Sequence, residues 1–259
     1  IITSMEVQAV RFKTERKLLE QYWCKKHTWR PQQIATIDWE GIARATRRSS
    51  PEQHKFAVKW AHNWLPVAKR LYRQGEVANN ICITCKSTVE DYDHLPRCPC
   101  RTEWRTTFIQ LLHEKLTALN TEEIIHREIT SELRKWLDDR QPDSTTAQST
   151  LGWGVFLRGV IHVEYGQRQQ EFYNQQHQQS HKRTGQTWTQ AIIMFIWNQM
   201  HALWKLRNNQ VHERNSAAVR QIDLDRAIAQ TTVIYNRQHE LLPSDRDAIL
   251  QNRTLEDRL

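Results

Sequence analysis

The sequence predicts an all-α fold. Glycine and proline, which most often interrupt helices, number only 7 each among 259 residues, while the helix-favouring Leu, Ala, Gln, Glu and Arg are common. Apolar residues recur at intervals of three and four, the helical period, and no alternating run is long enough to build a sheet. A chain of this length can bury a full core, and its 11 tryptophans supply much of the apolar area.

Composition divides the chain into three parts. Residues 1–140 are predicted to form a helical domain that contains a cysteine-rich turn at 82–100, and residues 151–259 a second helical region. Between them, residues 141–150 are polar, follow no period and contain a proline, which is typical of a linker. No apolar run approaches the length of a membrane-spanning helix, so we expect no membrane contact of that kind.

The N-terminal part is expected to begin with a helix over 5–26, followed by a loop over 29–41. The next helix has a clear start. Ser50 can cap it, Pro51 fits its first position, and Gln53 can reach back to complete a capping box. The apolar stripe of this helix, which we expect to face the core, consists of Phe56, Trp60 and Trp64.

Two more helices are predicted to form an αα-hairpin after the cysteine-rich turn. Before that turn, Pro66 is expected to break the preceding helix and to begin a shorter one, which Gly75 ends. In the hairpin, Asn120 and Glu123 mark the start of the second helix, and the pair should pack against the helix of Trp60. The apolar positions of the hairpin are Trp104, Phe108, Leu111, Leu112, Leu119, Ile125, Ile129, Leu133 and Trp136.

Beyond the predicted linker, the helical segments are 151–175, 189–212 and 218–241. The segment 189–212 is the strongest of them, because its apolar residues form one broad face. Residues 167–190 are rich in glutamine and poor in apolar residues, so part of that stretch is expected to be a loop.

One group of cysteine and histidine residues has the spacing of a metal site. Cys82 and Cys85 are separated by two residues, so both thiolates can bind one ion from a tight turn. His94 and Cys98 follow on a second short turn and complete a tetrahedron, and zinc suits this mixture of sulfur and imidazole. We therefore predict one structural zinc ion, in a helical bundle with a Cys3His zinc knuckle that is followed by a second helical region.

Other uses of these cysteines are less well supported. The odd total of 5 cysteines and the lack of a signal-peptide pattern disfavour a set of disulfides. A redox Cys-x2-Cys pair would need a preceding strand and a βαβ unit, and the sequence predicts neither. Cys100 remains an alternative to Cys98 as the fourth ligand, although the shorter loop from His94 to Cys98 closes more easily.

The chain is basic, with a formal net charge of +8, which favours phosphate backbones or anionic surfaces as partners. Folding around zinc would bring together the basic residues on both sides of the cysteines, and aromatic residues nearby could stack on unpaired bases. The alternative is a solvated basic face without a partner. The predicted nucleic-acid contacts are Lys55, Lys59, Lys69, Arg70, Arg73, Arg97, Arg101 and Arg105.

The motifs around the predicted metal site also resemble a known family. In order along the chain they are an apolar helix end, a basic helix, Cys-x2-Cys, an acidic spacer, His-Leu and Cys-Pro, at Trp64–Pro66, Lys69–Arg73, Cys82–Cys85, Glu90–Asp93, His94–Leu95 and Cys98–Pro99. This order resembles the zinc-binding region that follows the polymerase in reverse transcriptases of non-LTR retrotransposons. The stretch WKLRNNQVH at 204–212 is similar to a Trp-x2-Arg-Asn-x2-Val-His element near the end of such polyproteins. Cys100 is extra relative to the family pattern.

The resemblance implies binding of zinc and of RNA or DNA, beside an upstream polymerase part of the same polyprotein. The sequence contains neither a Tyr/Phe-x-Asp-Asp polymerase signature nor a spaced acidic set for two metal ions, so we expect no enzymatic activity from this chain. The carboxylates of a polymerase would lie upstream of Ile1.

The expected function is a non-catalytic zinc-dependent nucleic-acid-binding module that grips the RNA or DNA backbone. The alternative is a protein-interaction or scaffold module whose zinc is purely structural. Few cysteines with metal-like spacing fit a reducing compartment, so the expected location is intracellular, nuclear or cytoplasmic.

Overall fold

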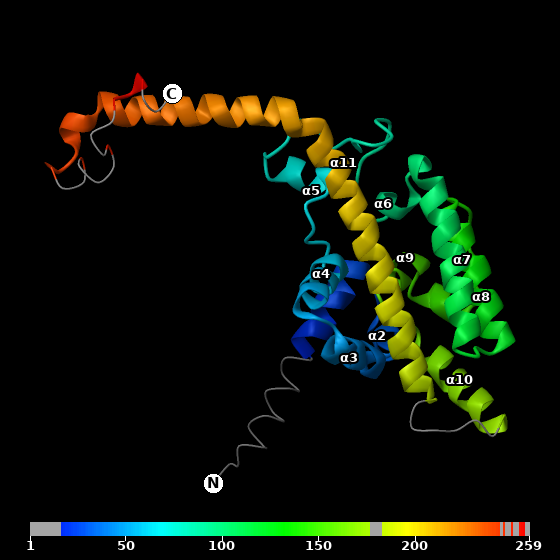
Figure 1. Ribbon diagram of the computed structural model, residues 1–259. Coiled ribbons are helices and arrows are strands. Elements are labelled where there is room, and N and C mark those ends of the chain that lie inside the picture. Colours follow the sequence, from blue (N-terminus) through cyan, green and yellow to red (C-terminus); the bar gives the residue numbers. More distant parts are fainter. Residues whose placement is uncertain (1–16, 177–182, 244–245, 247–249, 251–253, 257–259) are drawn as a thin grey trace, which may run out of the picture. The chain divides into compact units, whose positions relative to one another are not determined.

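A computed structural model describes residues 17–176, 183–243, 246, 250 and 254–256 (Figure 1). Helices dominate these residues, and no strand is present among them, so the predicted all-α fold is confirmed. The β-pairing in the described part of the chain consists of two isolated bridges, Ile37 with His162 and Ile81 with Val89. None of the described helices is long and apolar enough to cross a membrane.

The chain forms two compact units, Ile1–Lys205 and Leu206–Leu259. The division differs from the predicted one, because the polar stretch 141–150 is folded within the first unit. There the backbone N–H of Asp143 donates to Glu132. The side-chain amide of Gln148, which is buried, donates to the backbone carbonyls of Gly152 and Val160. These hydrogen bonds attach the segment to the first unit, whereas the polar groups of a linker would bind water.

The first half of the chain contains more helix than the sequence predicted. Residues 17–27 are helical, which agrees with the predicted first helix, whose residues 5–16 lie outside the described part. The predicted loop over 29–41 is wrong, because two helices occupy it: α2 (Pro31–Ala35) and the start of α3 (Trp39–Arg48). The carboxylate of Asp38 caps α3 by accepting the backbone N–H of Gly41 at 2.7 Å.

Helix α4 (Pro51–Ala61) begins as predicted. Ser50 accepts from the backbone N–H of Gln53 at 3.2 Å, and the Gln53 side chain accepts from Ser50 N–H at 3.1 Å, which completes the capping box. The prediction that Trp64 belongs to the apolar stripe is wrong. The helix ends at Ala61 and Asn63 turns the chain through a left-handed conformation (φ 57°), which leaves the Trp64 side chain 50% exposed.

The predicted αα-hairpin is present as α7 (Thr102–Ala118) and α8 (Glu123–Leu137). These helices share one hydrophobic core with Trp60 of α4. Three short elements lead into the hairpin: α5 (Ala68–Arg73), α6 (His94–Arg97) and the 3₁₀ turn η1 (Pro99–Arg101). Asn120 does not cap α8 but takes a left-handed conformation (φ 48°) in the turn between the two helices.

The remaining elements of the first unit are η2 (Ala147–Thr150), α9 (Trp153–Phe156), α10 (Val163–Gln175) and the start of α11 (Gly185–Asn236). The predicted helix over 151–175 is interrupted at Gly159. This residue has φ 83°, and a Cβ atom there would lie 2.4 Å from the indole nitrogen of Trp197. The two predicted helices over 189–212 and 218–241 are one continuous helix, α11, which the 3₁₀ turn η3 (Gln238–Glu240) follows.

Tryptophan side chains join these elements across the core of the first unit. Buried indole N–H groups donate from Trp60 to the Leu157 carbonyl (2.7 Å), from Trp188 to Thr121 Oγ1 (2.8 Å) and from Trp197 to the Arg158 carbonyl (3.0 Å). Each bond links segments far apart in sequence, and each satisfies the one polar atom of a large apolar side chain. The core therefore fixes the loop after α9, which carries Arg158, against α4 and α11.

Candidate metal centre

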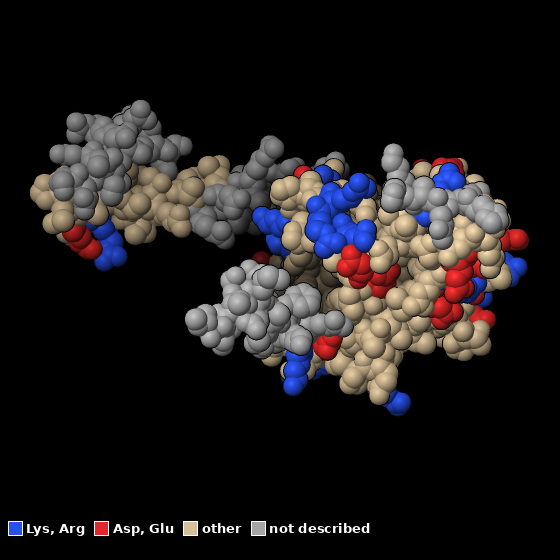
Figure 2. Space-filling model, turned by 90° about the horizontal axis from the view of Figure 1, so that it is seen from below, with Lys and Arg blue, Asp and Glu red and all other residues tan. Residues whose placement is uncertain are grey.

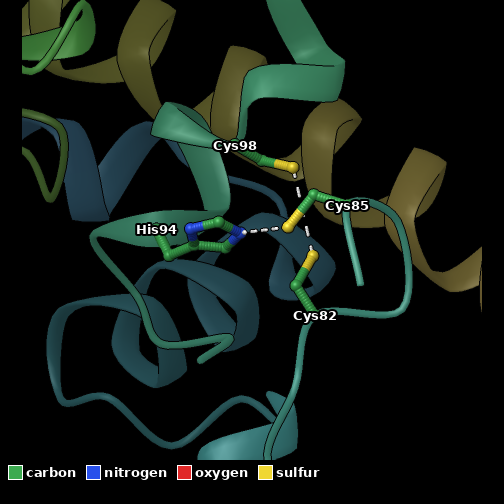
Figure 3. A group of neighbouring side chains, drawn as sticks. All are labelled: Cys82, Cys85, His94 and Cys98. Carbon is green, nitrogen blue, oxygen red and sulfur yellow. Dashed lines mark hydrogen bonds between the residues drawn. The ribbon is translucent and has the colours of Figure 1, made fainter. Parts of the chain in front are cut away.

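The structure brings the four predicted metal ligands together (Figure 3). The ligand atoms of Cys82, Cys85, His94 and Cys98 all lie within 4.8 Å of one another. The Sγ atoms of Cys82 and Cys98 are 4.0 Å apart, and Cys85 Sγ lies 3.5 Å from His94 Nε2. A tetrahedral zinc ion, with Zn–S of about 2.3 Å and Zn–N of about 2.0 Å, would place two sulfurs ~3.8 Å apart and sulfur and nitrogen ~3.6 Å apart.

The donor set therefore fits a tetrahedral metal ion. The cysteines are free thiols, and the separation of the sulfurs is far beyond the roughly 2.05 Å of a disulfide bond. Cys100 is exposed and lies outside the cluster, with its Sγ 3.9 Å from the Thr84 carbonyl oxygen. The structure thus assembles the site with Cys98 and not with Cys100.

A small hairpin presents the first two ligands. The backbone N–H of Cys82 donates to the Thr88 carbonyl at 2.8 Å, next to the bridge between Ile81 and Val89. The backbone N–H of Lys86 then returns to the Cys82 carbonyl at 2.8 Å, and Lys86 itself has a left-handed conformation (φ 58°). This tight turn is what allows two thiols separated by two residues to point at one position.

The acidic spacer positions the other two ligands. Asp91 Oδ1 accepts the backbone N–H of His94 at 2.9 Å, which starts α6, and Cys98 follows directly after this single helical turn. The carboxylate of Asp93 accepts from Arg158 at 2.9 Å. The acidic side chains of the spacer thus act on the backbone and on a distant arginine.

The thiols at the cluster differ in how readily they ionise. Burial opposes ionisation of Cys85, but hydrogen bonds from the Ser87 side chain and from the backbone at Ser87 and Thr88 lower its pKa to about 6. Burial raises the pKa of Cys98 to about 12, and the neighbouring Cys82 adds to the rise. A bound cation would offset both the burial and the repulsion between thiolates, because metal binding requires the deprotonated ligand.

Arg101, one of the predicted nucleic-acid contacts, is part of the metal-site scaffold instead. Its side chain is only 3% exposed. Nη1 donates to the Leu95 carbonyl at 2.7 Å and Nη2 to Thr84 Oγ1 at 3.3 Å, so one guanidinium joins the two turns that carry the ligands. The prediction that this residue contacts nucleic acid is therefore corrected. Its charge is enclosed by the protein.

Arg105 and Arg97 also bond mainly within the protein. Arg105 Nη1 donates to the Cys98 carbonyl at 2.7 Å. The guanidinium of Arg97 lies 5.1 Å from the ring centre of Trp136 and pairs with Asp139. For Arg105 the physical reason is local: α6 is a single turn, so carbonyls at its end have no helical partners and accept from the guanidinium group. Both side chains stay partly accessible, 28% for Arg97 and 14% for Arg105, so their contact with nucleic acid remains a prediction.

Helix α5 is fixed directly to the knuckle (82–100) by Glu90. This residue is fully buried. Its carboxylate accepts the backbone N–H of Ala68 at 2.7 Å, and its carbonyl accepts that of Lys69 at 3.1 Å. Lys69 Nζ in turn donates to Asp91 at 3.3 Å. The start of α5 is therefore built into the metal-binding turns.

A basic cavity lies beside this junction. It has a volume of about 220 Å³, and the charged residues that line it are Lys69, Arg70, Arg73, Arg158, Asp91 and Asp93. Four cations thus meet two carboxylates, for a net charge of +2. The Arg158 side chain is 7% exposed and pairs with Asp93. It was missed at the sequence level because it follows α9, far along the chain from α5.

Lys55 and Lys59, the other two predicted contacts, are exposed on α4 and do not line this cavity. Acidic and basic side chains are interspersed over the face of the molecule shown in Figure 2. Of the predicted contacts, the structure thus gathers Lys69, Arg70 and Arg73 at one cavity.

Comparison of the chain with protein-family models, with curated proteins and with solved structures gives no match. The resemblance to retrotransposon reverse transcriptases stays a prediction from the motifs.

Proposed function

We propose that this chain is a non-catalytic nucleic-acid-binding module whose fold depends on zinc. The observation that carries the proposal is the basic cavity beside the metal cluster, where Lys69, Arg70 and Arg73 meet the buried Arg158. A net positive cavity attracts phosphate, and contacts of this kind position a polynucleotide without reading its sequence. The proposed partner is therefore the backbone of RNA or DNA.

The cofactor in this proposal is one structural zinc ion, held by Cys82, Cys85, His94 and Cys98. Four protein ligands complete a tetrahedron and leave no open position for water or substrate. The ion would stabilise the fold and fix the knuckle to which Glu90 attaches α5. Zinc would act on nucleic-acid binding through the placement of that helix.

The motif order supports a place for this module in a retroelement reverse transcriptase polyprotein, beside the upstream polymerase part. In that setting the module would hold template RNA or target DNA near the polymerase, in the nucleus or cytoplasm.

A specific observation also favours the scaffold alternative. Two large aromatic side chains near the cavity, Trp64 and Tyr72, are each 50% exposed. Exposed apolar side chains are common at protein interfaces. In this version the zinc only stabilises the helices, and the aromatic side chains dock on another protein.

Binding of the purified chain to labelled single-stranded RNA, single-stranded DNA and duplex DNA, followed by fluorescence anisotropy, decides between the two. The proposal predicts binding at low salt to at least one of the three, weakening steeply between about 50 and 200 mM salt. No binding to any of them at the lower salt would reject the nucleic-acid proposal in favour of the scaffold.

A further inference from the structure

A row of aromatic rings lies next to the basic cavity. The ring of Trp64 is 5.0 Å from that of His62, measured between ring centres, and His62 is 5.4 Å from Tyr22 of the first helix. Tyr22 is 41% exposed and Trp64 is 50% exposed. The ring planes of Trp64 and His62 are tilted by 30°, and those of His62 and Tyr22 by 45°.

The row and the cavity are joined by the turn that ends α4. Asn63, the residue before Trp64, lines the cavity, and its carbonyl accepts from Arg70 Nη1 at 3.1 Å. Tyr72, which stands between Arg70 and Arg73 in the sequence of α5, is also exposed. The turn at Asn63 thus connects the cavity to the exposed ring of Trp64.

Two side chains that line the cavity have buried polar atoms without hydrogen-bond partners among the described residues. Arg158 is more than nine-tenths buried, and its Nε has no hydrogen-bond partner among the described residues. The side-chain oxygen of Asn63, in the wall of the cavity, is also a buried atom without a hydrogen-bond partner among the described residues. Buried polar atoms in folded proteins are nearly always paired, so unpaired ones on a cavity wall indicate a site that takes up a polar ligand.

We infer that the cavity and the aromatic row together bind a single-stranded polynucleotide, with a phosphate in the cavity against Arg158 and an adjacent unpaired base stacked on Trp64. This inference rests on the proposed nucleic-acid-binding function and adds the class of substrate. A phosphate would balance the net charge of +2 of the cavity, and its oxygens accept from several guanidinium donors at once. The stacking is open to any base, because every base has a π face.

The aromatic row is what separates single strands from duplexes. In a duplex the faces of the bases are stacked on one another, so a protein ring at the surface cannot stack on them. In a single strand the bases can leave the stack and lie on exposed rings. RNA and DNA share this chemistry, and the experiment therefore includes both.

The test compares Trp64→Ala with the wild type on single-stranded RNA, single-stranded DNA and duplex DNA at one low salt concentration. Loss of one stacking partner is expected to weaken single-strand binding roughly tenfold, and to leave duplex binding within about twofold. Trp64→Phe, which keeps a ring, should retain most of the affinity. Ile124→Ala, at an exposed apolar side chain on α8, is the matched control and should bind like the wild type.

The outcomes separate this inference from the function on which it rests. If the wild type binds no nucleic acid, the proposed function fails. If the wild type binds but Trp64→Ala does not weaken single-strand binding, or weakens duplex binding equally, only the inference fails. In that case the aromatic row would be assigned to a protein partner. Urea unfolding of each variant must show a wild-type midpoint, which an exposed side chain should allow.

Discussion

On the C-terminal side of the metal cluster, Arg101 and Arg105 donate to carbonyls of the knuckle. On the N-terminal side, Lys69 and Arg73 of α5 keep exposed side chains beside a cavity. Both flanks are basic, and both are in contact with the turns that carry the metal ligands. One flank stabilises the site, and the other is available to a partner.

The difference follows from how each flank satisfies its backbone. The single turn of α6 leaves carbonyls without helical partners, and guanidinium groups fill that need from inside. The first N–H groups of α5 are satisfied by Glu90, so the basic side chains of this helix are not needed to satisfy them. A cation near a metal site is therefore a binding candidate only after the backbone around it has been accounted for.

The largest effect is expected from the metal itself. Cys98→Ser, like Cys85→Ser, should lose the zinc and unfold the knuckle with the helices packed on it, because the binding energy of structural zinc, about 10 kcal/mol or more, is folding energy. Cys100→Ser should keep one zinc per chain and a wild-type midpoint. Zinc content after dialysis, together with circular dichroism in urea, measures both. Stoichiometric zinc in Cys98→Ser would contradict the ligand assignment.

The two flanks should respond very differently to loss of charge. Arg101→Met removes buried hydrogen bonds to Leu95 and Thr84 and should lower the free energy of unfolding by about 2–4 kcal/mol. Arg73→Met, at an exposed site, should change it by less than about 0.5 kcal/mol. Urea unfolding of the zinc-loaded proteins tests the pair. Equal destabilisation would remove the distinction between the flanks.

Breaking the junction between α5 and the knuckle should lower the free energy of unfolding somewhat less than Arg101→Met does. Glu90→Ala leaves the N–H of Ala68 without its carboxylate acceptor, so we expect a loss of about 2 kcal/mol in stability and weaker nucleic-acid binding. Glu76→Ala, at an exposed glutamate after α5, is the control and should change neither. The idea of a fixed junction fails if Glu90→Ala binds and unfolds like the wild type.

The smallest effect is on the salt dependence of binding. Lys69→Gln and Arg73→Gln should each lower the slope of log affinity against log salt by about 0.7–0.9, the contribution of one phosphate contact. Stability should stay within about 0.5 kcal/mol. Lys55→Gln, outside the cavity, should change the slope less. A slope that follows Lys55 instead of the α5 residues would move the binding surface to α4.

Local chemistry is what made much of this structure predictable. The capping box at Ser50 and Gln53 depends on residues three apart, and the α7–α8 hairpin follows the helical period of its apolar residues. The metal ligands are likewise set by short spacings. Cys82 with Cys85, and His94 with Cys98, each sit on one turn, so only the meeting of two turns had to be inferred.

What could not be predicted depends on long-range packing. The exposure of Trp64 follows from the left-handed turn at Asn63, which ends α4 one turn earlier than the apolar spacing suggests. The burial of Arg101 and Glu90 depends on which unpaired backbone groups lie nearby. Arg158 reaches the cavity because Trp197 fixes its loop from another helix. The spacing of residues along the sequence does not indicate such contacts.

The most direct test of the central claim is the affinity of the chain for labelled single-stranded RNA at low salt, before and after zinc is removed with a chelator and then restored. If the metal-bound knuckle places the α5 cations, binding should be present with zinc, fall at least tenfold without it, and return when zinc is added back. Equal binding by the zinc-loaded and zinc-free chain would show that the basic cavity does not depend on the metal centre, and would contradict the account.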